Sequence, residues 1–304
     1  MTEVRCALLP AGQREELATA VTEGGGEVVD VTHANALIWT STGQAEELRA
    51  LLDAHPHIRW VQLPFAGIEP FAGVLDSDRA WTCGKGVYAE PVAEHALALT
   101  LGGLRGIGRY APRRAWSAPY GMNLLGAHVC ILGGGAITRS LVRLLLPFGT
   151  YLTVVRNRTE PIPGVAEVFA LDDLHRALSE ADVVVLALAL TPHTEGILDA
   201  AAIDALPDHA LVVNVARGRH IDTDALVTAL EEGRLGGAAL DVTDPEPLPE
   251  GHPLWDREDV IITPHVGNTP EMGIKLLWAR VRENVERFGR GEELLGPVHV
   301  DLGY

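Results

Sequence analysis

The chain has 304 residues, with 41 acidic and 24 basic side chains and a formal net charge of −17 at pH 7. This length exceeds the size of one comfortable hydrophobic core, so two domains are expected. The acidic surplus repels nucleic acid and anionic membranes, although an arginine-lined cleft can still attract a small anionic substrate. We therefore expect neither nucleic acid nor a membrane as a partner.

Three cysteines, Cys6, Cys83 and Cys130, lie far apart in the sequence. They predict buried free thiols in a reducing compartment, and neither a disulfide framework nor zinc-ligand spacing is present. The N-terminus lacks the layout of a signal peptide, and no apolar run reaches the roughly 18 residues of a membrane span. These features predict a cytoplasmic protein without a metal site.

The first part of the chain alternates between short apolar segments and amphipathic ones. This alternation predicts a parallel sheet with helices on its faces. The predicted strands cover residues 4–9, 27–31, 36–40 and 58–63, and the predicted helices cover 13–23, closed by Gly24–Gly26, and 43–54.

The loop after the fourth of these strands is a candidate substrate site. Ala66 and Gly67 lie there, at the carboxyl end of a strand, and would leave backbone N–H groups free to hold a substrate carboxylate. An ordinary turn between strand and helix fits the same residues equally well.

A long apolar helix is expected to begin at Pro91, because proline suits the first helical position and few polar residues follow. A helix that is apolar nearly all round is buried between layers or domains, so the chain is expected to cross between its domains here. The segment from Tyr110 to Leu125 has no clear period and is predicted to be a loop across the cleft. Trp116 and Tyr120 would either close over a substrate or pack against the protein.

A glycine-rich turn follows, between a strand at 129–132 and a helix at 136–148. Gly133 and Gly135 match the first two glycines of a dinucleotide-binding turn, and the helix that begins with Ala136 and Ile137 would offer its N–H groups to a pyrophosphate. Thr138 stands where the third glycine is expected, and a tight turn without a ligand is an open alternative for this stretch alone.

The residues after the next strand, predicted at 151–155, indicate which dinucleotide binds. An acidic side chain there would accept hydrogen bonds from the adenosine ribose, whereas this chain has Arg156, Asn157 and Arg158. Guanidinium groups suit a 2′-phosphate, which favours NADP. The alternative is a solvated loop whose arginines have no role.

The remaining predicted strands of this region each end in a polar residue. They cover 181–188, 211–215, 238–242 and 260–263. Arg217, Asp241 with nearby Glu246, and His265 follow three successive strands, so an arginine, carboxylates and an imidazole should meet at one sheet edge. Each residue has an ordinary structural explanation, but together they indicate a catalytic site.

These segments carry a resemblance to a known family. The chain resembles the D-isomer-specific 2-hydroxyacid dehydrogenases over nearly its whole length, through Pro91–Leu101, Thr191–Gly196, Asn214–Gly218 with Ile221–Asp222, Leu240–Leu248 and Thr263–Gly267.

The resemblance implies an α/β fold in which a Rossmann-type nucleotide-binding domain, residues 95–270, is inserted in a smaller flavodoxin-like α/β substrate domain. That second domain would comprise residues 1–94 and 271–304. The helix after Pro270 would cross back, and Pro297–Val300 would rejoin the first domain. The resemblance also implies a homodimer.

By motif position, Arg217, Glu246 and His265 resemble the catalytic arginine, glutamate and histidine of the family. Reduction of a 2-oxo acid moves a hydride from the nicotinamide to C2, and His265 would protonate the carbonyl oxygen. A neighbouring Glu246 carboxylate favours the charged imidazolium, and Arg217 would hold the substrate carboxylate. Dinucleotide contacts are expected from Thr191, Thr194, Val215, Asp241 and Gly267.

Two departures from the family pattern direct the functional prediction. Thr138 and Arg156 are similar to the NADPH-preferring glyoxylate and hydroxypyruvate reductases, and Glu246 argues against formate as the substrate. We therefore expect a reductase that converts a small 2-oxo acid to a D-2-hydroxy acid, with NADP(H) favoured and NAD(H) possible. The alternative is a non-catalytic dinucleotide sensor of the same fold. A methyltransferase would leave the three catalytic candidates unexplained.

Overall fold

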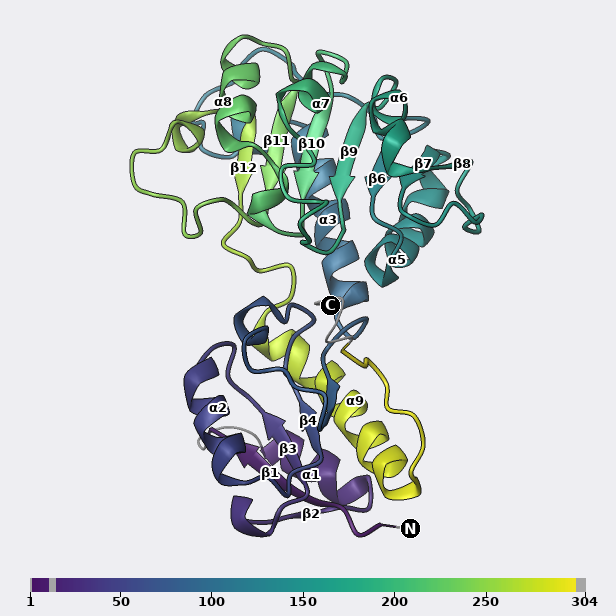
Figure 1. Ribbon diagram of the computed structural model, residues 1–304. Helices are drawn as coiled ribbons and strands as arrows, with labels where there is room; N and C mark the ends of the chain where they lie inside the picture. Colours follow the sequence, from purple (N-terminus) through teal and green to yellow (C-terminus); the bar gives the residue numbers. More distant parts are fainter. Residues whose placement is uncertain (1, 11–14, 299–304) are drawn as a thin grey trace. The chain divides into compact units, whose positions relative to one another are not determined.

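The computed structural model describes residues 2–10 and 15–298. The chain divides into two compact units, Met1–Tyr88 with Thr269–Tyr304, and Ala89–Asn268. Each unit is built on its own parallel sheet, as the arrows of Figure 1 show. Among the described residues, no helix is both long and apolar enough to cross a membrane.

The first unit contains a five-stranded sheet in the order β2-β1-β3-β4-β5. Its strands are β1 (Arg5–Leu9), β2 (Glu27–Val28), β3 (Ala36–Trp39), β4 (Trp60–Gln62) and β5 (Ala80–Thr82). The strand predicted at 27–31 is shorter than expected because Asp30 accepts a hydrogen bond from the Thr32 N–H and caps the 3₁₀ turn η1 (Val31–His33). Strand β5 was not predicted, because three residues carry no clear period.

Helices α1 (Glu15–Glu23), α2 (Ala45–Ala54) and α9 (Pro270–Arg290) and the turn η2 (Glu69–Phe71) complete this unit. The predicted glycine stop is confirmed, since the Gly24 N–H bonds to the Ala20 carbonyl and Gly25 has a φ of +81°. The predicted helix residues 13 and 14 lie outside the described residues.

The apolar face of α9 packs against α1, where Leu17, Val21, Val281 and Val285 share one core. After α9, the Val298 N–H donates to the Trp81 carbonyl at 2.9 Å. The predicted return of the chain to the first unit is therefore confirmed as far as Val298, and residues 299–300 lie outside the described part.

The second unit contains a seven-stranded parallel sheet in the order β12-β11-β10-β9-β6-β7-β8. Its strands are β6 (His128–Leu132), β7 (Tyr151–Val155), β8 (Glu167–Phe169), β9 (Val183–Leu186), β10 (Leu211–Asn214), β11 (Gly237–Leu240) and β12 (Val260–Ile262). Successive residues of a strand point to opposite faces, and both faces here are covered. Val129 and Ile131 face one helical layer, whereas Cys130 and Leu132 face the other.

One layer is formed by α3 (Ala89–Leu104) and α5 (Ala136–Leu145), which continues into η3 (Leu146–Phe148). The other contains α6 (Leu174–Leu178), α7 (Ala200–Asp204) and α8 (Thr223–Glu231), with the short turns η4 (Leu171–Asp173), η5 (Gly218–His220) and η6 (Pro253–Asp256). The strand order reverses between β6 and β9, which makes this the topological switch point where doubly wound sheets bind ligands. The predicted Rossmann-type α/β fold is confirmed.

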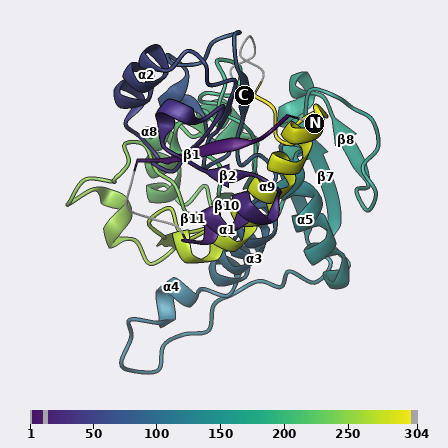
Figure 2. The same ribbon diagram turned by 90° about the horizontal axis from the view of Figure 1, so that it is seen from below.

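The expected loop after α4 (Ile107–Tyr110) is present, but its predicted place across a cleft is wrong. The Tyr120 hydroxyl donates to the Gly236 carbonyl at 3.2 Å, just before β11, and its ring lies 4.2 Å below the Arg109 guanidinium. The loop is therefore anchored at the amino-terminal edge of the sheet, opposite the catalytic candidates. Figure 2 shows it reaching outward beyond α4, and Trp116 in it is fully exposed.

Candidate active site

The candidate residues of the second unit follow the carboxyl ends of its strands. Gly133 and Gly135 follow β6, Arg156 follows β7, Thr191 and Thr194 follow β9, Arg217 follows β10, Asp241 follows β11 and His265 follows β12. Because every pairing in this sheet is parallel, these ends form one edge. The structure thus gathers the predicted residues at the edge that contains the switch point.

The turn after β6 is shaped for close backbone approach. Gly133 has a φ of +112°, and a Cβ there would overlap the Ala187 carbonyl beyond β9. The Thr138 hydroxyl donates to the Gly133 carbonyl at 2.8 Å, which explains how threonine is tolerated where a third glycine was expected. Thr138 therefore fastens α5 to the turn with a hydrogen bond.

The first turn of α5 fits the diphosphate of a dinucleotide. Gly135 is the N-cap residue, and no described side chain caps the helix. A Cβ on Gly135 would meet no other segment within 4 Å, so the space beside it is open. The N–H groups around Ala136 and Ile137 therefore face outward without a side-chain acceptor, at the positive end of the helix dipole. A phosphate can take the place that a capping side chain occupies elsewhere.

Arg156 is not a freely solvated side chain. Only 16% of it is exposed, and its Nη2 lies 2.5 Å from the Glu160 carbonyl oxygen and 3.2 Å from the Glu160 carboxylate. Its aliphatic part lies over Gly134, where a Cβ would overlap it. Asn157 and Arg158 are exposed beside it. The structure thus places one guanidinium against the glycine turn and two further polar side chains at its side.

The loop after β9 is held by its own threonines. The Thr194 hydroxyl donates to the Ala189 carbonyl at 2.7 Å and accepts from the Thr191 N–H at 2.8 Å. Buried His220 lies with Nδ1 2.8 Å from the Thr194 carbonyl and so joins this loop to the turn that carries Arg217. Val215, in the same turn, is buried.

The Arg217 turn is built tightly against the loop after β11. Asn214 bridges it, since its amide donates to the Arg217 carbonyl at 2.9 Å and its oxygen accepts from the Ala216 N–H at 3.0 Å. A Cβ on Gly218 would overlap the Thr243 carbonyl, so only glycine allows this approach.

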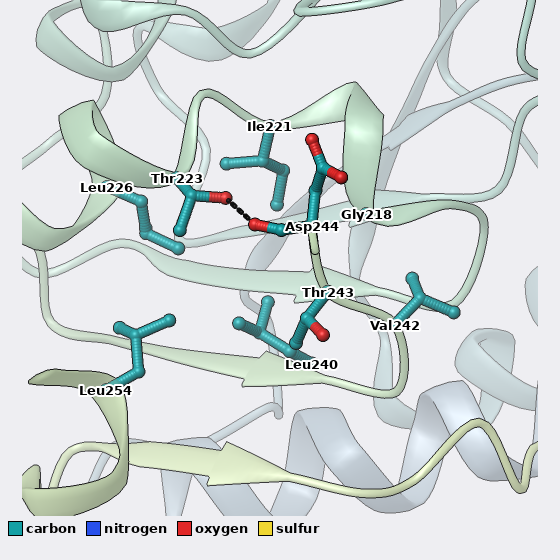
Figure 3. A pocket seen from close by; sticks show the side chains of 9 residues that line it. All are labelled: Gly218, Ile221, Thr223, Leu226, Leu240, Val242, Thr243, Asp244 and Leu254. Carbon is teal, nitrogen blue, oxygen red and sulfur yellow. Dashed lines mark hydrogen bonds between the residues drawn. The ribbon is translucent and has the colours of Figure 1, made fainter. Parts of the chain in front are cut away.

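Behind the Arg217 turn lies a small apolar pocket (Figure 3). The volume of this pocket is about 10 Å³, about enough for one water molecule, so the elements around it are closely packed. Across it, the Thr223 hydroxyl donates to the Asp244 carbonyl at 3.0 Å. This bond anchors the segment that leads to Glu246.

Asp241 is the most buried carboxylate of the site, with 3% of its side chain exposed. It accepts hydrogen bonds from the Thr263 hydroxyl at 2.5 Å, the Val266 N–H at 2.9 Å and the Gly267 N–H at 2.8 Å. Burial raises the pKa of this carboxyl, but the hydrogen bonds, including one from His95, outweigh burial and hold the pKa below its ordinary value. Asp241 is therefore an ionised anchor for the loop after β12.

His265 and Glu246 form an open pair at the same edge. His265 Nδ1 lies 2.6 Å from Glu246 Oε1, and 51% and 42% of the two side chains are exposed. His265 has a φ of +53°, unusual for a residue with a Cβ, and its N–H donates to the Asp241 carbonyl at 2.8 Å. The carboxylate orients the ring through Nδ1, so Nε2 is the ring nitrogen that lies away from Glu246.

Ala66 and Gly67 belong to the other unit, in the loop after β4. Ala66 is exposed and Gly67 is half-buried. The loop is supported by the Gly84 N–H, which donates to the Phe65 carbonyl at 2.9 Å, and by the Tyr88 hydroxyl, which donates to the Pro64 carbonyl at 2.6 Å.

Sequence reasoning missed the contribution of α3 to the site. His95 Nε2 lies 3.2 Å from Asp241 Oδ1 and 3.0 Å from Thr263 Oγ1. The available signal was a histidine directly before the apolar run of this helix, because such a side chain needs a polar partner when it is largely buried.

With this geometry in view, comparison with known proteins assigns the family. Residues 97–267 match the family described as D-isomer specific 2-hydroxyacid dehydrogenase, NAD binding domain. The chain belongs to this family. It is an NAD(P)-dependent oxidoreductase with 2-hydroxyacid dehydrogenase activity, acting on small 2-hydroxy or 2-oxo acids.

Three similar proteins illustrate the relationship. An uncharacterised Corynebacterium melassecola protein is 38% identical over 95% of this chain and 97% of its own length. A glyoxylate/hydroxypyruvate reductase A from Photorhabdus laumondii is 31% identical over 69% of this chain and 68% of its own. A 2-hydroxyacid dehydrogenase from Xanthobacter autotrophicus, solved with NADPH and MES, has a TM-score of 0.86 over both whole chains at 24% identity, which shows the shared fold.

Proposed function

We propose that the protein reduces a small 2-oxo acid, of the glyoxylate or hydroxypyruvate type, to a D-2-hydroxy acid with NADPH as the favoured cofactor. The observation that carries the proposal is the half-exposed His265–Glu246 pair, 2.6 Å apart at the carboxyl edge of the sheet. A proton donor must be both oriented and accessible, and this pair is both.

His265 acts as the general acid in this proposal. Its Nε2 donates a proton to the carbonyl oxygen as negative charge develops there, and takes the proton back in the reverse direction. Glu246 holds Nδ1 and so keeps the ring oriented toward the substrate. The bound nicotinamide supplies or accepts the hydride.

Arg217 binds the substrate carboxylate and orients the carbonyl. A guanidinium suits this task because it offers two parallel donors to a planar carboxylate. Asn214 and Gly218 fix the turn that contains Arg217, so the backbone from which the guanidinium extends is held in place. We further propose that Ala66 and Gly67 contribute backbone donors from the substrate-binding domain, which comprises the unit of residues 1–88 and 269–304.

The second unit is the dinucleotide-binding domain in this proposal. Gly133, Gly135, Ala136 and Ile137 would hold the diphosphate at the start of α5, where no described side chain caps the helix. Thr191, Thr194, Val215, Asp241 and Gly267 would line the nicotinamide side.

Arg156, with Asn157 and Arg158, would hold the 2′-phosphate of NADP. Two observations support this preference: the guanidinium lies against the glycine turn, and a fold relative was solved with NADPH. Binding of the 2′-phosphate would break the bond between Arg156 and Glu160. A cofactor without this phosphate leaves the bond intact, so we expect NAD(H) to be used as well, at a lower rate.

The substrate class draws support from the Photorhabdus relative, whose name specifies glyoxylate and hydroxypyruvate. The test is the oxidation of NADPH and NADH, measured in parallel by absorbance with glyoxylate, hydroxypyruvate, pyruvate and phenylpyruvate. We expect turnover to be fastest with NADPH and one of the two smallest polar acids. Faster turnover with phenylpyruvate, or with NADH, would contradict the respective part of the proposal.

His265→Ala tests the acid–base role separately. The variant should bind NADPH as the wild type does but lose turnover by orders of magnitude. His209→Ala is the matched control, because His209 also pairs with a carboxylate, Asp182, but at the amino-terminal edge of the sheet. Unchanged turnover in His265→Ala would contradict the proposed acid–base role of His265.

Arg156→Asp tests the cofactor preference. We expect the ratio of kcat/KM for NADPH to that for NADH to fall at least about tenfold, because a phosphate would then face a carboxylate. Arg176→Asp, on an exposed arginine of α6, controls for the change in net charge. An unchanged ratio would show that Arg156 does not bind the 2′-phosphate of the cofactor.

We also propose a homodimer working in the cytoplasm. The projecting loop with its fully exposed Trp116 supports the dimer, since a lone tryptophan of this exposure is a typical interface anchor. The three buried free cysteines support a reducing compartment. Light scattering should give twice the chain mass for the wild type and the single mass for Trp116→Glu, and a monomeric wild type would refute the dimer.

A further inference from the structure

Beside the catalytic candidates, a second histidine–carboxylate pair lies inside the protein. His95, on α3, has 20% of its side chain exposed, and Asp241 has 3%. The two residues are 146 positions apart in the sequence. The proposed mechanism gives His95 no task, although it touches the loop that carries His265.

The hydrogen-bond directions in this cluster can be assigned from the chemistry of its members. An ionised Asp241 only accepts, so the Thr263 hydroxyl donates to it across 2.5 Å. The oxygen of Thr263 is then left as an acceptor toward His95 Nε2 at 3.0 Å, and Asp241 Oδ1 is an acceptor at 3.2 Å. His95 Nε2 therefore carries a proton and donates to both oxygens.

The loop after β12 donates to Asp241 from both sides of His265. Asp241 accepts from Thr263 before His265, and from the Val266 and Gly267 N–H groups after it. Between them, the His265 backbone keeps a φ of +53°, a conformation that needs support from its surroundings.

His95 also closes the packing around this loop. A Cβ on Gly267 would lie 3.0 Å from Asp241 Oδ2 and 3.6 Å from the Cδ2 atom of His95. Gly267, Asp241 and His95 thus stack closely, so a shift of the imidazole is transmitted to the backbone that follows His265.

We propose that His95 is a positioning residue for catalysis: by donating to Asp241 and Thr263, it holds the loop that presents His265 to the substrate. The inference rests on the acid–base role proposed for His265. It adds to that role a residue of α3 that the proposed mechanism does not otherwise use.

The test compares His95→Leu, which removes the donor, with His95→Gln, whose amide nitrogen can reach the same acceptors. We expect His95→Leu to lower kcat about tenfold to 100-fold, because small displacements of a catalytic group have effects of this size. The KM for the 2-oxo acid should change less than about twofold, since the Arg217 turn is untouched, and His95→Gln should restore most of kcat. A merely structural role would not give this separation of kcat from KM or this rescue.

A double-mutant cycle shows whether the effect passes through His265. In the His265→Ala background, His95→Leu should have almost no further effect on the residual rate, because the group that it positions is gone. His209→Leu, which removes a histidine from the Asp182 pair at the opposite sheet edge, should leave kcat unchanged. If His95→Leu does not fold, Thr263→Val removes the same relay and should lower kcat with the same dependence on His265.

The outcomes separate the two proposals. The positioning role would be overturned by a normal kcat in folded His95→Leu, or by equal losses of kcat in the leucine and glutamine variants. It would also be overturned if His95→Leu lowered the residual rate of His265→Ala as strongly as it lowers the rate of the wild type. Full activity of His265→Ala alone would instead refute the acid–base role itself.

Discussion

Replacement of Asp241 by asparagine should both destabilise the dinucleotide-binding unit and impair turnover. The change keeps the shape of the side chain but removes its charge and turns one oxygen into an NH₂ group. If the remaining oxygen takes the place of Oδ1, it keeps the bonds from Thr263, Val266 and His95. The NH₂ group then faces the buried Gly267 N–H, which loses its acceptor.

The size of the effect follows from these contacts. A hydrogen bond to a charged group contributes about 1.5–3 kcal/mol, and a buried N–H left without an acceptor costs about 1–3 kcal/mol. We therefore expect a loss of about 3–5 kcal/mol in the free energy of unfolding, which corresponds to a fall in Tm of at least about 6 °C for a unit of this size. The displaced loop should also lower kcat at least about tenfold.

The pH dependence has a definite sign. The pKa of Asp241 is lowered in the folded protein, so its stabilising contribution is complete above the unfolded value of about 3.9. That contribution is lost only as the pH falls through the folded pKa, which is lower still. The part of the stability difference between wild type and Asp241→Asn that comes from the ionisation of Asp241 itself should consequently stay constant from about pH 6 to about pH 8.

Scanning calorimetry and steady-state kinetics at several pH values measure these effects. Asp182→Asn is the control, since Asp182 accepts from the His128 N–H and from His209 at the opposite edge of the sheet. The control should lower Tm by a few degrees at most and leave kcat unchanged. A Tm for Asp241→Asn within about 2 °C of the wild type, with normal turnover, would refute the anchoring role.

Three further predictions concern packing and chemical reactivity. Gly218→Ala should lower kcat and Tm together because its Cβ has no room, whereas Gly43→Ala, where nothing lies within 4 Å, should match the wild type in both assays. Thr138→Val should raise the Kd for NADPH, measured by fluorescence titration, since the bond that fastens α5 to the glycine turn is lost; an unchanged Kd would contradict this. Burial raises the pKa of Cys6 and Cys130 to about 12, so neither thiol should react with Ellman's reagent at about pH 8 until the protein unfolds.

The sheet of the second unit was predictable because its strands are buried on both faces. Such strands are continuous apolar runs, and Val183–Leu186 and Leu211–Asn214 lie within the segments that the sequence indicated. The place of the candidate residues followed from the same pattern, since the ends of parallel strands share an edge. This is why Arg217 and His265 could be assigned to one edge without a structure.

Contacts between distant segments could not be predicted in this way. The bond between His95 and Asp241 joins α3 to the end of β11, and no periodicity links the two positions. The anchoring of Tyr120 at the amino-terminal edge was missed for the same reason, because one hydroxyl bond to the Gly236 carbonyl decides where an irregular loop lies. Sequence patterns specify the elements, whereas individual side-chain bonds decide how loops are placed between them.

Three histidine–carboxylate pairs of the second unit show why residue types alone do not define a catalytic site. His209 and Asp182 lie 2.7 Å apart at the amino-terminal edge, away from the switch point where a dinucleotide binds. His95 reaches a carboxylate that is almost fully buried and already holds backbone donors, so its proton is committed to the protein.

Of these three pairs, only the third combines the carboxyl edge of the sheet with exposure of both side chains. His265 and Glu246 are each about half exposed, and the ring is oriented by the carboxylate at one nitrogen while the other stays available. Proton transfer requires a group that can exchange its partner, whereas positioning requires one that cannot. Burial and location therefore divide chemically similar pairs into the two roles that we propose, proton transfer for His265 and positioning of its loop for His95.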